Sequence, residues 1–140
     1  MKNELVYEPL PYYSINEVRQ IIKTGSIEDI RILPFSVGEY AKNWKEAQDI
    51  CVELSTHEDE LVRASTAMGF AYIARTKRKL EKHIVKPILL KLLRECIEYK
   101  WMVIDALSDI KIFMKWNIGE RAIKKYNNKW YTPPLRITKR

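Results

Sequence analysis

Apolar residues recur at intervals of three and four along most of the chain, which is the spacing that places side chains on one face of an α-helix. On this basis we predict four strong helices, over residues 39–55, 61–74, 84–96 and 100–115. The second of them is apolar on most sides, so we expect it at the centre of the fold. Its small residues should let a neighbouring backbone come close; they are Ala64, Ala67, Gly69, Ala71 and Ala74.

The amino-terminal part carries a clear helix-start signal followed by a break. Ser14-Ile-Asn-Glu17 has the capping-box spacing, which predicts a short helix from Ile15 to about Lys23 that Gly25 ends. Because a proline interrupts helical hydrogen bonding, Pro34 should prevent a long helix in the next segment. We therefore predict irregular structure over residues 26–37.

Three further prolines and a glycine indicate the structure of the carboxyl-terminal half. Pro87 is expected in the first turn of the third strong helix, where a missing N–H matters little. A short helix is predicted after Gly119 through Lys125. Residues 127–140 contain Pro133-Pro134 and are expected to be extended.

The strong helices form an internal repeat with an offset of 39 residues. The matched pairs are Ile50 with Leu89, Cys51 with Leu90, Leu54 with Leu93, Ala67 with Ala106, Met68 with Leu107 and Ile73 with Ile112. Each unit is a helix, a short turn and a second helix, and the period lies near the lower end for HEAT and armadillo repeats. The predicted fold is therefore all-α, with HEAT-like stacked hairpins and about five to six helices. We expect a single domain over 1–140, with an amino-terminal capping segment (1–38) and a basic carboxyl-terminal segment (118–140).

Composition is that of an ordinary globular protein and removes several function classes. The 140 residues are 46% hydrophobic and 31% charged, and no apolar run is long enough for a membrane span or a secretory signal. Cys51 and Cys96 lie in apolar helical patterns without a CxxC motif, which favours reduced core residues over a disulfide framework. These observations predict a cytoplasmic protein.

Residue patterns typical of catalysis are absent from the sequence. His57 and His83 lie 26 residues apart in different turns, where they are expected as surface or capping residues and not as metal ligands. The four glycines form no phosphate-binding loop, and no serine or cysteine lies in a nucleophile motif. We predict a protein that is not an enzyme and that uses neither a cofactor nor a metal.

The net charge of +7 is distributed unevenly. Residues 118–140 hold seven basic residues against one acidic residue, and a second basic cluster lies over residues 75–82. From these two segments we select as candidate partner-binding residues Arg75, Lys77, Arg78, Lys82, Lys124, Lys125, Trp130 and Tyr131. In such a mixture, the basic residues can bind nucleic-acid phosphates and the aromatic residues can stack on bases. The same surface also suits docking onto an acidic protein. The alternative is that Trp130 and Tyr131 staple the tail to the core while the lysines stay solvated.

Asp105 and Asp109 form a further candidate pair. Carboxylates four residues apart on a helix make a good acceptor for a partner's guanidinium or ammonium group. The internal alternative is that they pair with Arg63 or Arg75 on the adjacent helix.

Three motifs together resemble a known family. They are Asp59-Glu-Leu-Val-Arg63-Ala-Ser-Thr-Ala-Met-Gly69-Phe-Ala-Tyr-Ile-Ala-Arg75, Val85-x-Pro87 and Asp105-Ala-Leu-x-Asp109-Ile-x-x-Phe113. The first resembles a HEAT repeat, and over residues 47–113 the set is similar to small HEAT-like immunity proteins of bacterial contact-dependent growth inhibition systems. The resemblance implies a cytoplasmic protein that binds a cognate toxin domain and occludes its active site. The alternative is a nucleic-acid-binding HEAT-like protein that uses the basic 75–82 turn and the carboxyl-terminal tail.

Overall fold

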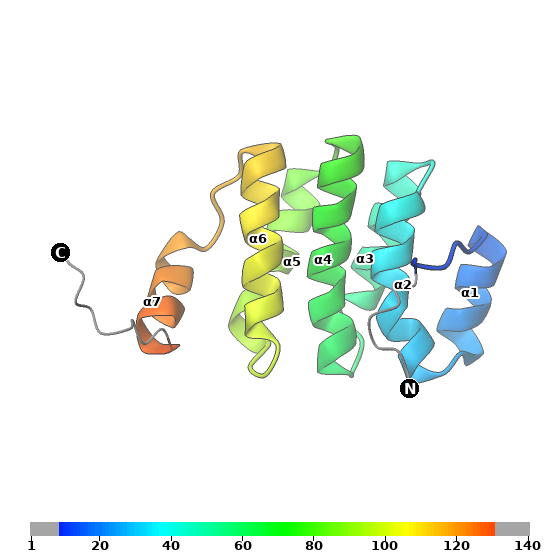
Figure 1. The fold of residues 1–140 in the computed structure, drawn as a ribbon, viewed down its shortest axis with the longest axis horizontal. Coiled ribbons are helices and arrows are strands. Elements are labelled where there is room, and N and C mark those ends of the chain that lie inside the picture. Colours follow the sequence, from blue (N-terminus) through cyan, green and yellow to red (C-terminus); the bar gives the residue numbers. More distant parts are fainter. Residues whose placement is uncertain (1–8, 131–140) are drawn as a thin grey trace, which may run out of the picture.

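The computed structural model describes residues 9–130, and within that range the protein consists of seven helices and contains no strand (Figure 1). The helices are α1 (Ile15–Thr24), α2 (Ile27–Tyr40), α3 (Trp44–Leu54), α4 (Glu60–Lys77), α5 (Lys82–Glu95), α6 (Lys100–Met114) and α7 (Glu120–Trp130). The all-α prediction is confirmed. The expected count of five to six helices was too low, because α2 was not foreseen.

Helices α2, α4 and α6 lie side by side in one layer, with α3 and α5 behind it and α1 and α7 at the two ends (Figure 1). The three helices run in the same direction. Arg31 near the start of α2 binds Asp59 at the start of α4, and Glu39 near the end of α2 binds Arg75 near the end of α4. Helix α4 packs most extensively against α2 and α6, which confirms the prediction of a central second helix.

The predicted repeat corresponds to two successive hairpins, α3–α4 and α5–α6. In three of the six matched pairs both residues are buried: Ile50 with Leu89, Leu54 with Leu93, and Ala67 with Ala106. The last pair differs, because the Ile73 side chain is fully buried while Ile112 is 61% exposed. Helix α4 has a neighbour on each side within its layer, whereas the corresponding face of α6 points out of the stack.

The prediction of irregular structure over residues 26–37 was wrong, since α2 runs through the segment with Pro34 inside it. Pro34 removes only the hydrogen bond that its position would donate to the Ile30 carbonyl. Burial compensates for this loss, because Pro34 packs against Gly69 of α4. A Cβ at Gly69 would lie only 2.9 Å from the Pro34 carbonyl oxygen, so the glycine is what allows the two backbones to approach.

Helix boundaries around the first hairpin also differ from the prediction. Glu39 and Tyr40 belong to the end of α2, and the next helix starts at Trp44, where the Asn43 side chain accepts hydrogen bonds from two backbone N–H groups. By contrast, the capping box at Ser14 is confirmed. Its hydroxyl accepts from the Glu17 N–H at 3.2 Å, and the Glu17 carboxylate accepts from the Ser14 N–H at 2.8 Å.

In the carboxyl-terminal half, α5 begins at Lys82, so Pro87 lies in its second turn and not in the first as predicted. The helix tolerates the loss of one hydrogen bond to the His83 carbonyl because Val85 and Leu89 on either side of the proline are fully buried. The final helix continues to Trp130, so residues 127–130 are helical and not extended. Residues 131–140 lie outside the described part of the chain.

The core contains both cysteines, as predicted. Cys51 and Cys96 are buried and form no disulfide. Burial raises the pKa of the Cys51 thiol far above its usual range, so this group stays protonated. None of the helices within residues 9–130 combines the length and the apolar character that crossing a membrane requires.

Candidate partner-binding surface

The parallel layer brings the carboxyl ends of α4 and α6 to the same side of the molecule, at the top in Figure 1. We call this side the basic edge, and its residues are Arg75, Lys77, Arg78, Lys79, Lys82, Lys111 and Lys115. The structure therefore brings together four of the candidate residues, Arg75, Lys77, Arg78 and Lys82, with Lys111 of α6 and Lys115 directly after it, which the sequence alone did not associate with them.

Both helices reach the basic edge with the same kind of ending. Arg78 after α4 has φ 55° and ψ 33°, and Lys115 after α6 has φ 64° and ψ 30°, so each adopts the left-handed conformation that glycine usually provides. Their backbone N–H groups donate to the carbonyls of Ala74 and Lys111. Basic residues at these two positions also oppose the partial negative charge of the helix ends.

Three cations of the basic edge lie over aromatic rings. The guanidinium of Arg75 is 4.5 Å from the centre of the Tyr72 ring, and that of Arg78 is 5.1 Å from the centre of the Phe113 ring. The ammonium of Lys82 is 5.6 Å from the centre of the Trp116 ring. Such contacts are attractive and orient the side chain without neutralising its charge.

Ion pairing differs among these three cations. Arg75 pairs with Glu39. Within residues 9–130, no carboxylate comes within ion-pair distance of Arg78 or Lys82. Arg78 and Lys82 are also exposed, so their charges face solvent in fixed positions.

Gln48 anchors the turn that carries the basic edge. Its side chain is fully buried, donates to the Glu81 carboxylate at 2.8 Å and accepts from the Glu81 N–H at 2.8 Å. The bond from Gln48, followed by Lys45, lowers the pKa of Glu81. Sequence reasoning missed this residue, although an amide on the apolar face of a predicted helix was the available signal, since buried polar groups need partners.

Helix α7 adds further positive charge next to the basic edge. It is joined to α6 by the Lys111–Glu120 ion pair at 3.0 Å, and it exposes the predicted residues Lys124 and Lys125. Trp130 is the last residue of α7, but its side chain lies outside what the structure describes, as does all of Tyr131. Whether these two aromatic residues staple the tail to the core stays untested.

Asp105 and Asp109 lie in the middle of α6, about two turns and one turn before Phe113 respectively, and not on the basic edge. Neither of the arginines considered as internal partners pairs with them. Arg75 binds Glu39, and Arg63 donates to the backbone carbonyls of His57 and Glu58. Asp105 is exposed and Asp109 is half-buried, and neither forms an ion pair within residues 9–130.

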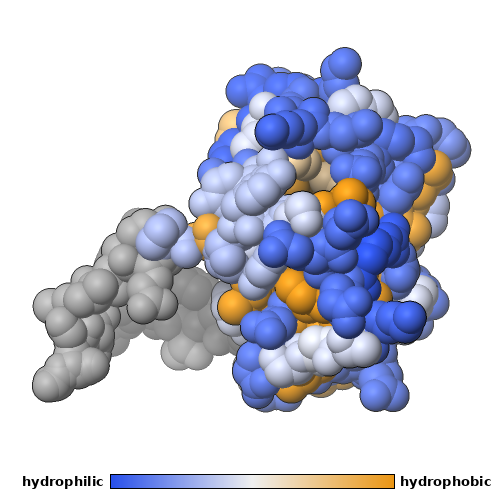
Figure 2. Space-filling view, turned by 90° about the vertical axis from the view of Figure 1, so that its right-hand side faces the viewer, coloured by the Kyte–Doolittle hydropathy of each residue, from blue (hydrophilic) through white to orange (hydrophobic). Residues whose placement is uncertain are grey.

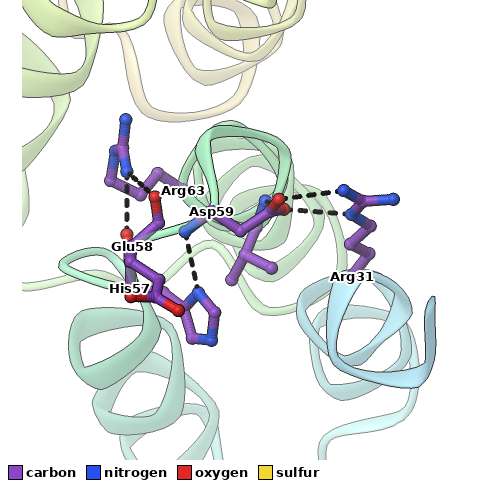
Figure 3. A network of polar contacts seen from close by, with 6 residues as sticks. Arg31, His57, Glu58, Asp59 and Arg63 are labelled. Atoms are coloured by element: carbon purple, nitrogen blue, oxygen red, sulfur yellow. Dashed lines mark hydrogen bonds and ion pairs between the residues drawn. The ribbon is translucent and has the colours of Figure 1, made fainter. Parts of the chain in front are cut away.

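The opposite side of the layer, at the starts of α2, α4 and α6, holds a network of polar contacts (Figure 3). Arg31 donates two hydrogen bonds to the Asp59 carboxylate, at 3.0 and 2.8 Å. Asp59 also caps α4 by accepting from the Val62 N–H at 3.0 Å, and its own N–H donates to Nδ1 of His57. The bond from Arg31 lowers the pKa of Asp59 against the opposing effect of burial. His57 thus acts as a turn residue, as expected.

Among residues 9–130, no cluster of three or more histidine, cysteine, aspartate or glutamate side chains is placed to hold a metal ion. The basic edge offers cations that lie over aromatic rings. Comparison with known proteins adds no identity: no family model matches the chain, and neither the curated proteins nor the solved structures contain a significant match.

Proposed function

We propose that this chain is a non-enzymatic binding protein whose basic edge docks onto an acidic surface of a partner protein. The observation that carries the proposal is the placement of Arg78 and Lys82 over the rings of Phe113 and Trp116 without a carboxylate partner in the described residues. Cations fixed in this way lose little conformational freedom on binding, which reduces the cost of association. Their charge also speeds encounter with an acidic partner.

The partner that we propose is a cognate toxin domain, which makes the chain an immunity protein. This step rests on the resemblance of residues 47–113 to HEAT-like immunity proteins. The mechanism is occlusion, in which a stiff helical layer covers the toxin's active site or substrate groove and supplies no chemistry of its own. Asp105 and Asp109 give the same layer a second, acidic contact for a basic rim of the toxin.

Co-expression with the toxin domain encoded beside this gene tests the proposal. We expect the wild-type chain to restore growth and to form a complex with a Kd below micromolar. Replacing both Arg78 and Lys82 by alanine should weaken the complex at least tenfold, since two oriented charges are lost. The matched control removes two exposed lysines elsewhere, Lys23→Ala with Lys91→Ala, and should weaken it much less. Absence of both growth rescue and a complex would refute the toxin assignment.

Nucleic-acid binding is the second candidate, favoured by the position of α7. Its exposed Arg121, Lys124 and Lys125 extend the basic edge into a longer positive surface. Binding to phosphates releases counterions, so affinity for a labelled oligonucleotide should fall steeply as salt rises. A titration at about 50 mM salt distinguishes the two candidates, because an immunity protein is expected to show no saturable binding under this condition.

A further inference from the structure

A cleft of about 330 Å³ lies at the end of the molecule where α1 begins, away from the basic edge residues of α4 and α6. It is enclosed by residues 12–18, by the end of α2 and by the start of α3. Figure 2 views this end and shows apolar residues in patches between hydrophilic ones. The cleft is lined by the apolar side chains of Val18, Val37, Ala47 and Ile50, all of which belong to the buried core.

Ser36 lines the same cleft and is the unusual residue in it. Its side chain is 2% exposed, and its hydroxyl has no hydrogen-bond partner in the described residues. A buried hydroxyl without a partner is unfavourable, and native proteins rarely keep one without a reason. Position 36 on an apolar helix face would fit alanine equally well, so the hydroxyl calls for a partner that enters the cleft.

Tyrosine rings form part of the cleft wall. Tyr12 and Tyr40 meet edge to face, with ring centres 6.0 Å apart and planes at 82°. The Tyr40 hydroxyl donates to the Leu10 carbonyl at 2.8 Å, which holds the segment before α1 against α2. Tyr13 also lines the cleft. Aromatic walls of this kind favour a flat aromatic occupant, since rings pack well edge to face or offset.

The charges around the cleft argue against an anionic occupant. The starts of α1 and α3 both line it, but the Ser14 hydroxyl already accepts from one N–H of α1 and the Asn43 side chain from two N–H groups of α3. Lys42 and Glu46 at the lining carry opposite charges. The lining therefore favours neither sign of charge, and an ionised ligand would lose its hydration among the apolar side chains of the cleft.

We propose that this cleft binds a small neutral aromatic molecule that carries one hydroxyl group, with the Ser36 hydroxyl as its hydrogen-bond partner. The volume lies at the lower limit of small-molecule sites, which run from about 300 to 1,000 Å³, so the ligand has one or two rings. Because the Ser36 oxygen is buried, the ligand's hydroxyl lies at the depth of the cleft and its ring lies against the tyrosines. This site is independent of the proposed docking function.

A pair of isosteric probes tests the proposal on the full chain. Phenol and toluene differ only by a hydroxyl in place of a methyl group, and binding is followed through the backbone amide signals of residues 36–47 in NMR titrations. For the wild type we expect saturable shifts confined to the cleft and an affinity for phenol roughly fivefold higher than for toluene, as one hydrogen bond provides. In Ser36→Ala this preference should disappear while toluene binds as before.

Two further results decide the matter. Tyr12→Ala removes an exposed wall ring and should weaken both probes by a similar factor, with an unchanged helical circular dichroism spectrum. If neither probe produces saturable shifts at millimolar concentration, or if the shifts spread over distant helices, no site exists. A preference for phenol that persists unchanged in Ser36→Ala would show that the Ser36 hydroxyl is not the hydrogen-bond partner and would overturn the proposal.

Discussion

The two edges of the α2–α4–α6 layer contain the same types of charged residue in different roles. At the starts of the helices, Arg31 and Asp59 bind each other and Arg63 binds backbone carbonyls, so these charges hold the hairpins together. At the basic edge, Arg78 and Lys82 lie over rings and have no carboxylate partner in the described residues. The comparison teaches that charges paired with a carboxylate or with backbone carbonyls serve the fold, whereas the two ring-held charges without a carboxylate, Arg78 and Lys82, stay open to a partner.

The largest loss of stability should come from removing the contacts of Asp59 at the starts of the helices. Asp59→Ala removes both the cap of α4 and the acceptor of Arg31, and we expect a loss of about 3 kcal/mol in the free energy of unfolding. Urea denaturation followed by circular dichroism measures it. Glu58→Ala is the matched control, because this neighbouring carboxylate is exposed and only its backbone carbonyl takes part in the network. Equal losses in the two variants would contradict the assigned role of Asp59.

Removing the anchor of the basic edge should have the next largest effect. Gln48→Leu leaves the Glu81 N–H and carboxylate without their buried partner, and we expect a loss of about 2 kcal/mol. Amide hydrogen exchange should accelerate most at residues 78–84. If exchange instead rises evenly over all helices, Gln48 supports the core in general and does not position this turn.

Lowering the pH should reduce the contribution of Asp59, at the starts of the helices, to the free energy of unfolding. The pKa of Asp59 is lower in the folded protein than in the unfolded chain, so its contribution to stability is present above the unfolded pKa, about 3.9, and is lost as pH falls through the folded pKa. Because a protonated carboxyl still accepts a hydrogen bond, the loss should be smaller than in Asp59→Ala. Denaturation midpoints between pH 7 and pH 2 test this, and Asp59→Asn should show a flatter profile over that range than the wild type.

The smallest effect concerns the helix ending at Arg78. Glycine adopts the left-handed conformation without strain, so Arg78→Gly should be more stable than Arg78→Ala by about 1 kcal/mol. Both variants lose the contact with Phe113, and both should bind the partner equally weakly. A difference in partner affinity between them would show that backbone geometry, and not the cation, governs docking.

Much of this architecture was predictable from local pattern. The apolar periodicity correctly placed α4, α5 and α6, and the capping box correctly placed the start of α1. Helix α2 was not predictable in this way, because the local effect of Pro34 is offset by its burial against Gly69, a residue 35 positions later. Tertiary packing of this kind leaves no signal in the short segment itself.

The arrangement of the basic edge was likewise not predictable from the local sequence. The charge of residues 75–82 is visible in the sequence, but the rings that orient it belong to Phe113 and Trp116. These rings come close only because α4 and α6 run in parallel and end at the same level. Likewise, Ile73 and Ile112 match in the repeat yet differ in exposure, since the position of a hairpin within the stack decides which faces are covered.

The common direction of α2, α4 and α6 affects how the protein is oriented as it approaches a charged surface. Each helix end contributes about half a negative charge at the basic edge, and the full charges of the side chains there exceed this contribution. The protein therefore carries a permanent asymmetry of charge along the layer. In the field of an approaching acidic surface, this asymmetry exerts a torque that turns the molecule to face the surface with Arg78 and Lys82 before any atoms touch.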